Sequence, residues 1–194
     1  MSDVHPYPQD ITADPFIIFG GLFSRKIILS ELIKLEPKES SLFSELLTLS
    51  RQCSSEKLLQ EGIEKTLNKY GFSCSKPSGV SNCDRLLGDS FLVEIKLNQN
   101  NNDPQFWNGS QEDNAILQTR RYLNESKSRN WAVLTNGQVL RLMHKDHQLN
   151  FIDFWICDSV KSGKTKHNAL FEKMLIDSKF VDDLLERSKK ERKI

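Results

Sequence analysis

The sequence has little of what would set it apart from an ordinary globular protein. Its 194 residues include 27 lysines and arginines and 26 aspartates and glutamates, so the net charge is only +1. This balance excludes a protein that binds polyanions through its overall charge, and any partner with phosphates must be met by local charge. With 9 glycines and 6 prolines, the chain also does not have the composition of a low-complexity protein.

Long apolar runs and paired cysteines are missing as well. The longest apolar stretches, such as residues 16–22, are far shorter than the roughly 20 residues that span a bilayer. The first fifteen residues lack the basic start and the apolar run of a secretory signal. We therefore expect a cytoplasmic protein with no membrane partner. The four cysteines include no C-x-x-C pair, which favours reduced thiols over a disulfide framework or a zinc site.

The chain is long enough to bury one core, and it contains no internal repeat or linker that would divide it. Its first fifteen residues hold three prolines and no periodicity, which predicts a mobile arm at 1–15. A single domain is expected at 16–194, with its core at about 54–156 and C-terminal helices at 168–194.

Helical and strand patterns alternate along this domain. Apolar spacing predicts helices at 26–34, 40–51, 56–70, 111–124, 170–176 and 180–192. Alternation predicts strands at 80–87, 91–97, 131–134, 139–143 and 151–156. Ser54 and Ser55 are placed to cap the helix at 56–70, and Ser110 and Asp113 to form a capping box ahead of 111–124. The order of elements predicts an α/β fold of the α+β kind, with a central mixed sheet flanked by helices.

The strand at 91–97 carries charge where a central strand is normally apolar. Residues two apart share a face, so Glu94 and Lys96 project together while their neighbours pack on the other side. A three-residue turn at 88–90 would place Asp84 opposite Glu94 on that face; a two-residue turn would place it on the other, and a bulge could also decide the register. Two carboxylates and a lysine suit phosphodiester hydrolysis, which needs oxygen ligands for Mg²⁺ and a cation beside the attacking water. The alternative is an exposed ion pair between Glu94 and Lys96.

Asp84, nine intervening residues and then Glu94-Ile95-Lys96 resemble the PD-(D/E)XK nuclease signature, with Cys83 at the position of the proline. The segment Gln118-Thr119-Arg120-Arg121-Tyr122 matches the Q-x-x-x-Y pattern of the helix that follows the hairpin in this family. Residues 131–137 and 140–142 further resemble the nuclease domains at the front of type IIG restriction enzymes and type I restriction subunits. The resemblance covers residues 56–143 and implies a restriction-endonuclease-like core. The chain has neither an N-P-P-Y-like methyltransferase motif nor a helicase ATP site.

The resemblance implies an endonuclease that hydrolyses DNA with Mg²⁺, or with Mn²⁺ as a substitute. Asp84, Glu94 and the backbone carbonyl of Ile95 would hold the metal, and Lys96 would orient or help deprotonate the attacking water. Gln118 would orient the lysine, the water or a phosphate, with Tyr122 as an accessory residue.

The first helix of such a fold often contributes an acid, and three glutamates are available there. We choose Glu56, because it falls within the apolar stripe that faces the core, whereas Glu64 lies at the margin of the stripe and Glu61 points away. The alternative for Glu56 is a favourable acid in the first turn of a helix.

Basic residues near the second helix of the motif are candidates for contact with DNA phosphates. They are Arg120, Arg121, Lys127 and Arg129, and a basic tail holds Lys189, Lys190, Arg192 and Lys193. The expected partner is DNA, with a methyltransferase or specificity subunit and a second copy of the chain as further candidates. Two alternatives remain: a catalytically silent domain of the same fold that binds nucleic acid or a partner protein, and an unrelated domain in which Asp84, Glu94 and Lys96 do not converge.

Overall fold

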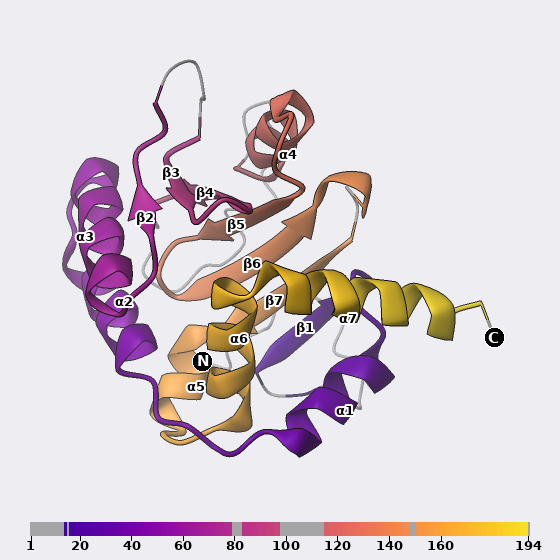
Figure 1. The fold of residues 1–194 in the computed structure, drawn as a ribbon. Coiled ribbons are helices and arrows are strands. Elements are labelled where there is room, and N and C mark those ends of the chain that lie inside the picture. The colour runs from indigo at the N-terminus through magenta and orange to yellow at the C-terminus, as the bar shows by residue number, and fades with distance from the viewer. Residues whose placement is uncertain (1–13, 15, 79–82, 98–114, 148–149, 194) are drawn as a thin grey trace, which may run out of the picture.

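A computed structural model describes residue 14 and residues 16–78, 83–97, 115–147 and 150–193 of the chain. Its strands form one seven-stranded sheet in the order β1-β7-β6-β5-β4-β3-β2 (Figure 1). The strands are β1 (Ile17–Gly20), β2 (Cys74–Ser75), β3 (Arg85–Leu87), β4 (Phe91–Ile95), β5 (Trp131–Thr135), β6 (Val139–His144) and β7 (Phe151–Trp155). The helices are α1 (Arg25–Lys34), α2 (Ser41–Gln52), α3 (Glu56–Lys69), α4 (Ala115–Glu125), α5 (Ile156–Lys161), α6 (Lys166–Ile176) and α7 (Ser178–Glu191), with the short 3-10 turn η2 (Lys145–His147).

This mixed α/β architecture confirms the fold class expected from the sequence. In the described sheet, β4 and β5 are parallel and all other neighbouring strands are antiparallel. Parallel neighbours cannot be joined by a tight turn and need a longer crossover, and α4 lies between them in the sequence. The carboxyl ends of β4 and β5 therefore meet at the same edge of the sheet.

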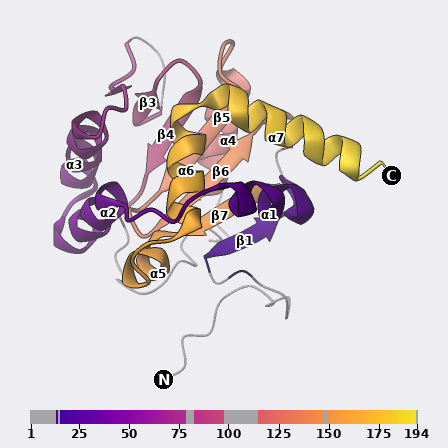
Figure 2. The ribbon, with the colours of Figure 1, turned by 60° about the horizontal axis from the view of Figure 1, so that its bottom comes forward.

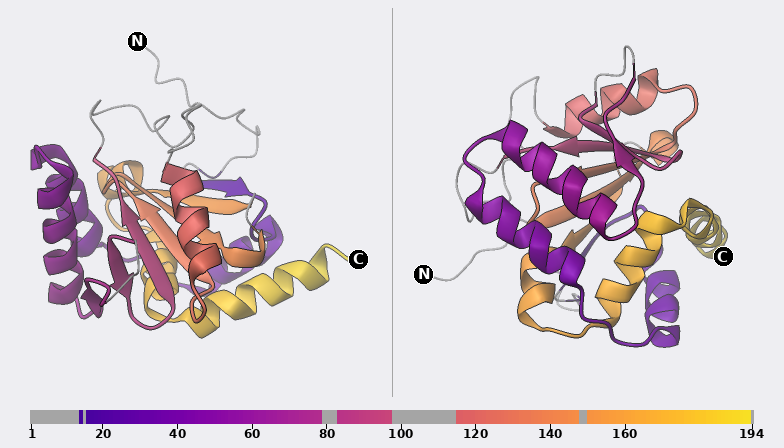
Figure 3. Two further views of the ribbon diagram at one scale, coloured as in Figure 1. Left: turned by 90° about the horizontal axis from the view of Figure 1, so that it is seen from above. Right: turned by 60° about the vertical axis from the view of Figure 1, so that its left-hand side comes forward.

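The two faces of the sheet carry different helices. Helices α1, α2, α3, α6 and α7 contribute to the larger core on one face, and α4 packs on the opposite face, which we call the α4 face (Figures 2 and 3). The division follows the alternation of side chains along each strand. In β4, Phe91, Val93 and Ile95 enter the larger core, whereas Leu92 enters the core beneath α4. Glu94 has the same parity as Leu92 and thus lies on the α4 face.

Most helix boundaries agree with the patterns that predicted them. The hydroxyl of Ser55 accepts a hydrogen bond from the backbone N–H of Leu58 and caps α3, and Ser40 caps α2 in the same way through Phe43. Helix α4 is described only from Ala115, so the capping box expected at Ser110 and Asp113 lies outside the described residues. The arm at 1–15 lies outside them too, apart from Asp14.

Some predicted boundaries were wrong. Strand β4 ends at Ile95 rather than at residue 97, and Ile156 begins α5 instead of ending β7. Strands β1 and β2 were not predicted, because segments of four and two residues are too short to show a period. Strand β1 pairs with β7 along its whole length and forms one edge of the sheet. Within the described chain, no helix combines the length and apolar composition needed to cross a bilayer.

The turn after β5 packs directly on α2. Asn136 opens this turn by accepting hydrogen bonds from the backbone N–H groups of Gln138 and Val139. Gly137 follows with a φ of 80°, and a Cβ added there would lie 2.7 Å from the carbonyl oxygen of Leu46 in α2. The turn and the helix can approach this closely only because residue 137 has no side chain.

Gly137→Ala should therefore destabilise the protein more than Gly71→Ala. Both glycines have a positive φ, but a Cβ at Gly71 would meet nothing within 4 Å. Backbone strain alone should cost about 1–2 kcal/mol at either position, and the clash with α2 should add about 1–3 kcal/mol at Gly137. Urea unfolding followed by circular dichroism measures both losses. Equal losses would show that α2 moves aside without cost.

Candidate active site

The β3–β4 hairpin sets the position of Asp84. The two strands pair Arg85 with Val93 and Leu87 with Phe91, so the turn between them has three residues, 88–90. Continuing this register by one residue places Asp84 opposite Glu94. Of the two registers considered from the sequence, the structure has the one that puts both carboxylates on the same face.

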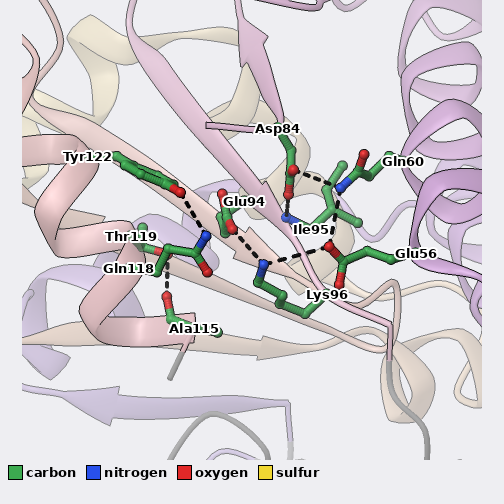
Figure 4. A network of polar contacts seen from close by, with 10 residues as sticks. All are labelled: Glu56, Gln60, Asp84, Glu94, Ile95, Lys96, Ala115, Gln118, Thr119 and Tyr122. Atoms are coloured by element: carbon green, nitrogen blue, oxygen red, sulfur yellow. Dashed lines mark hydrogen bonds and ion pairs between the residues drawn. The ribbon is translucent and has the colours of Figure 1, made fainter. Parts of the chain in front are cut away.

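Both oxygens of the Asp84 carboxylate are held by donors. Oδ2 accepts a hydrogen bond of 2.7 Å from the backbone N–H of Ile95, and Oδ1 accepts one of 2.7 Å from Nε2 of Gln60 in α3 (Figure 4). Strand β3 begins at Arg85, so the Ile95 N–H lies past the last pair of β3 and β4 residues. The Asp84 side chain provides the acceptor for this N–H. The carboxylate is thereby fixed at the end of β4.

Glu94 and Lys96 form a largely buried ion pair beside Asp84. The Glu94 side chain is 2% exposed, and its Oε1 lies 2.8 Å from Nζ of Lys96. The other oxygen, Oε2, is buried and has no hydrogen-bond partner among the described residues. The backbone N–H of Lys96 donates to the carbonyl oxygen of Thr135, which ties the base of this side chain to β5.

Of the three glutamates on α3, Glu56 reaches this group. Its Oε1 lies 3.7 Å from Nζ of Lys96, and its side chain is 43% exposed. Glu64 pairs with the buried Arg85 instead. Residues Glu56, Asp84, Glu94 and Lys96 therefore lie together, and we call them the acid–lysine cluster.

Burial and like charge perturb the acids of this cluster. Burial and, to a smaller extent, the nearby Asp84 carboxylate together raise the pKa of Glu94 from its ordinary value of 4.5 to about 7, against the opposing effect of Lys96. The pKa of Asp84 is also raised, mainly by burial, although the Ile95 N–H and Lys96 oppose this. Burial acts to lower the pKa of Lys96, but its contacts with Glu94, Glu56 and Asp84 outweigh burial and raise that pKa. Lys96 therefore stays protonated at neutral pH.

The cluster has the chemistry of a site for a hard divalent cation. Three carboxylates face one ammonium group, which leaves two negative charges uncompensated when all the acids are ionised. Such a cation could be held by Oε2 of Glu94, which has no hydrogen-bond partner among the described residues, by the remaining lone pairs of Asp84 and by the carbonyl oxygen of Ile95. No group of three His, Cys, Asp or Glu side chains in the described chain is arranged to hold a metal. Mg²⁺ does not need one, because it usually binds one or two carboxylates and keeps several waters.

Gln118 and Tyr122 lie on the side of α4 that faces the cluster. Nε2 of Gln118 donates a hydrogen bond of 2.7 Å to the hydroxyl of Tyr122, whose side chain is buried against the sheet. Figure 4 shows the Gln118 amide directed from α4 toward Glu94 and Lys96. The two residues form a unit within α4, one turn apart.

The four basic residues proposed for phosphate contact differ in their surroundings. Arg121 and Lys127 are exposed, and Arg121 lies over the ring of Tyr122. Arg129 is half-buried. Arg120 is also half-buried, and burial together with the charge of Arg141 lowers its pKa. In the second basic group, Lys189 pairs with Glu186 on α7.

Two polar features of the structure were not identified from the sequence. Gln60 was not singled out, although it follows Glu56 by four residues and so shares its side of the helix. Arg141 and Asp153 form a buried bidentate ion pair across β6 and β7, with both contacts at 2.7 Å. The alternation of these strands gave no sign that a charged pair would replace an apolar one in the core.

Glu94→Gln should stabilise the protein relative to the unmodified form at pH 8, but much less at pH 4.5. The raised pKa means that folded Glu94 holds a proton that the unfolded chain has already lost between about pH 4.5 and pH 7. The free energy of unfolding therefore falls as pH rises through that window, and glutamine removes this loss, roughly 2–3 kcal/mol. Urea unfolding of both proteins at pH 4.5, 6 and 8 measures it. A difference independent of pH would show that Glu94 titrates normally.

The chain matches no family model, no curated protein and no solved structure with which it was compared. The likeness to PD-(D/E)XK nucleases therefore rests on the motif residues themselves.

Proposed function

We propose that the chain is a Mg²⁺-dependent endonuclease that hydrolyses DNA phosphodiester bonds and belongs to a restriction system. The observation that supports this most directly is the acid–lysine cluster: Asp84, Glu94 and Lys96 meet at the end of β4, and Glu56 approaches from α3. The cluster combines oxygen ligands, a protonated lysine and uncompensated negative charge. An ion pair that served only to stabilise the fold would not need two further carboxylates beside it.

Each residue has a defined task in this proposal. Asp84, Glu94 and the Ile95 carbonyl hold the cation, which when bound supplies Lewis-acid stabilisation of the phosphate. Lys96 is protonated beside the three acids, and it would orient the attacking water and stabilise negative charge on the phosphate. Glu56 holds Lys96 from the exposed side. Gln118, supported by Tyr122, positions the water or a phosphate oxygen from α4.

Contact with DNA is assigned to the basic side chains of α4 and the segment that follows it. Arg121 and Lys127 are exposed and can meet phosphates directly, and Arg120 and Arg129 extend the same basic region. We place the protein in the cytoplasm, with no membrane partner. A methyltransferase or specificity subunit, or a second copy of the chain, would supply sequence recognition or the cut in the second strand.

A catalytically silent domain of the same fold, which binds nucleic acid or a partner protein, is the second candidate. One observation favours it: Lys96 already contacts Glu94 and approaches Glu56, so the cluster is partly neutralised by its own lysine. Such a domain would bind no divalent cation despite its intact residues.

Asp84→Asn and Lys96→Met should each lower the rate of Mg²⁺-dependent DNA cleavage by roughly 100-fold or more, because each removes a group that acts directly on the reacting phosphate or its water. The assay is nicking of supercoiled plasmid, with single-stranded DNA run in parallel. Asp89→Asn and Lys57→Met are matched controls, since both side chains are exposed, one in the β3–β4 turn and one on α3.

Full activity of the Asp84 or Lys96 variant would place the chemistry elsewhere. Equal losses in the controls would point to a general effect on folding or DNA binding. Absence of cleavage by every form, the unmodified protein included, would contradict the endonuclease proposal for the chain acting alone.

Mg²⁺ should raise the melting temperature of the unmodified protein at pH 7.5 and leave that of Asp84→Asn nearly unchanged. A cation that binds only the folded state stabilises it by about 2.7 kcal/mol at a concentration of 100 times its Kd. Differential scanning calorimetry over a series of Mg²⁺ concentrations measures the effect, with Asp89→Asn again as the control. No stabilisation of the unmodified protein would favour the silent domain.

A further inference from the structure

Gln60 bridges two acids that come from different parts of the fold. It lies on α3, one turn after Glu56, and it is half-buried. Its Nε2 donates to Oδ1 of Asp84 at 2.7 Å and to Oε1 of Glu56 at 3.4 Å (Figure 4). One amide nitrogen thus contacts the acid of the hairpin and the acid of the helix at once.

The chemistry of the two neighbours determines how this amide is oriented. An ionised carboxylate only accepts hydrogen bonds, and a glutamine amide has two N–H groups on its nitrogen and none on its oxygen. With the oxygen turned toward Asp84 and Glu56, lone pairs would face lone pairs on both sides. The nitrogen therefore faces the acids, and each of its hydrogens has an acceptor.

We infer that Gln60 is a positioning residue that holds the Asp84 carboxylate in place to receive the divalent cation. This inference rests on the function proposed above. Asp84 lies just before the first residue of the short strand β3. Among the described residues, its carboxylate accepts hydrogen bonds from Gln60 and from the backbone N–H of Ile95. The two donors act from different elements, α3 and β4, and together they fix the plane of the carboxylate.

A neutral amide suits this task better than a charged side chain. A lysine or arginine at position 60 could donate to the same oxygens, but its positive charge would compete with the cation for the two acids. The amide takes one lone pair of Oδ1 and leaves the rest of the carboxylate free. Outer contacts of this kind typically change metal affinity or activity by about 10–100-fold when they are removed.

Gln60→Met tests the inference, because methionine has a similar length and no donor. Gln60→Glu is the second variant, which keeps the shape but replaces the donor with a fourth carboxylate beside the three of the cluster. Gln52→Met is the matched control, since Gln52 is exposed at the end of α2. Circular dichroism and urea unfolding establish that each variant folds.

Two measurements are made on each folded protein. The first is the pKa of Asp84, followed by NMR of its labelled carboxyl carbon without any metal. The second is the Mg²⁺ concentration at half-maximal response, read from thermal stabilisation and from DNA cleavage. Gln60→Met should raise the pKa of Asp84, because the ionised form loses a donor. It should also raise the half-maximal Mg²⁺ concentration by about 10–100-fold, with most of the maximal rate restored at saturating Mg²⁺.

Gln60→Glu should raise the pKa of Asp84 further still, because a negative charge replaces the donor. Gln52→Met should change neither quantity. The inference is overturned if Gln60→Met folds normally and leaves the pKa of Asp84 unchanged, or if it raises that pKa without weakening the response to Mg²⁺. If the unmodified protein neither binds Mg²⁺ nor cleaves DNA, the proposed function fails, whereas the pKa of Asp84 still shows whether Gln60 holds the carboxylate.

Discussion

The hydrogen bond from the Ile95 backbone N–H to the Asp84 carboxylate is the contact on which the site depends. It forms because the three-residue turn at 88–90 places Asp84, the residue just before β3, opposite Glu94. A turn shorter by one residue would move Asp84 to the opposite face and leave Glu94 and Lys96 as a simple ion pair. The geometry of a turn that carries no functional side chain thus determines whether the two acids meet.

Around that contact, burial and charge work against each other. The sheet and α4 exclude water from Glu94, which favours its neutral form, while Lys96 favours the ionised one. Burial and the neighbouring Asp84 prevail, so Glu94 is not fully ionised at neutral pH. A group of this kind gains most from an added positive charge, and perturbed acids gathered at one point are typical of functional sites. The buried Arg141–Asp153 pair on the same face differs, because both carboxylate oxygens of Asp153 accept a hydrogen bond from Arg141, whereas Oε2 of Glu94 has no partner among the described residues.

Much of this arrangement could be predicted from local pattern. The E-x-K spacing at the end of β4 predicted that Glu94 and Lys96 lie on one side, and helical geometry selected Glu56 over Glu64, which the structure pairs with Arg85. Gln60 and the Arg141–Asp153 pair could not be found in this way, because each depends on a partner distant in sequence. Strand β1 was missed for a related reason: its four residues become a strand only through pairing with β7. Local periodicity carries no information about such partners.

The close approach of Gly137 to Leu46 links α2 to the site through a chain of backbone contacts. Helix α2 limits the position of the turn, the turn follows Thr135, and the carbonyl of Thr135 receives the N–H of Lys96. None of the cluster's side chains comes from α2. A bulky side chain at position 137 would therefore displace the turn or α2, and with the turn the backbone that holds Lys96. The absence of a side chain at residue 137 thus constrains the position of a lysine that the glycine itself does not contact.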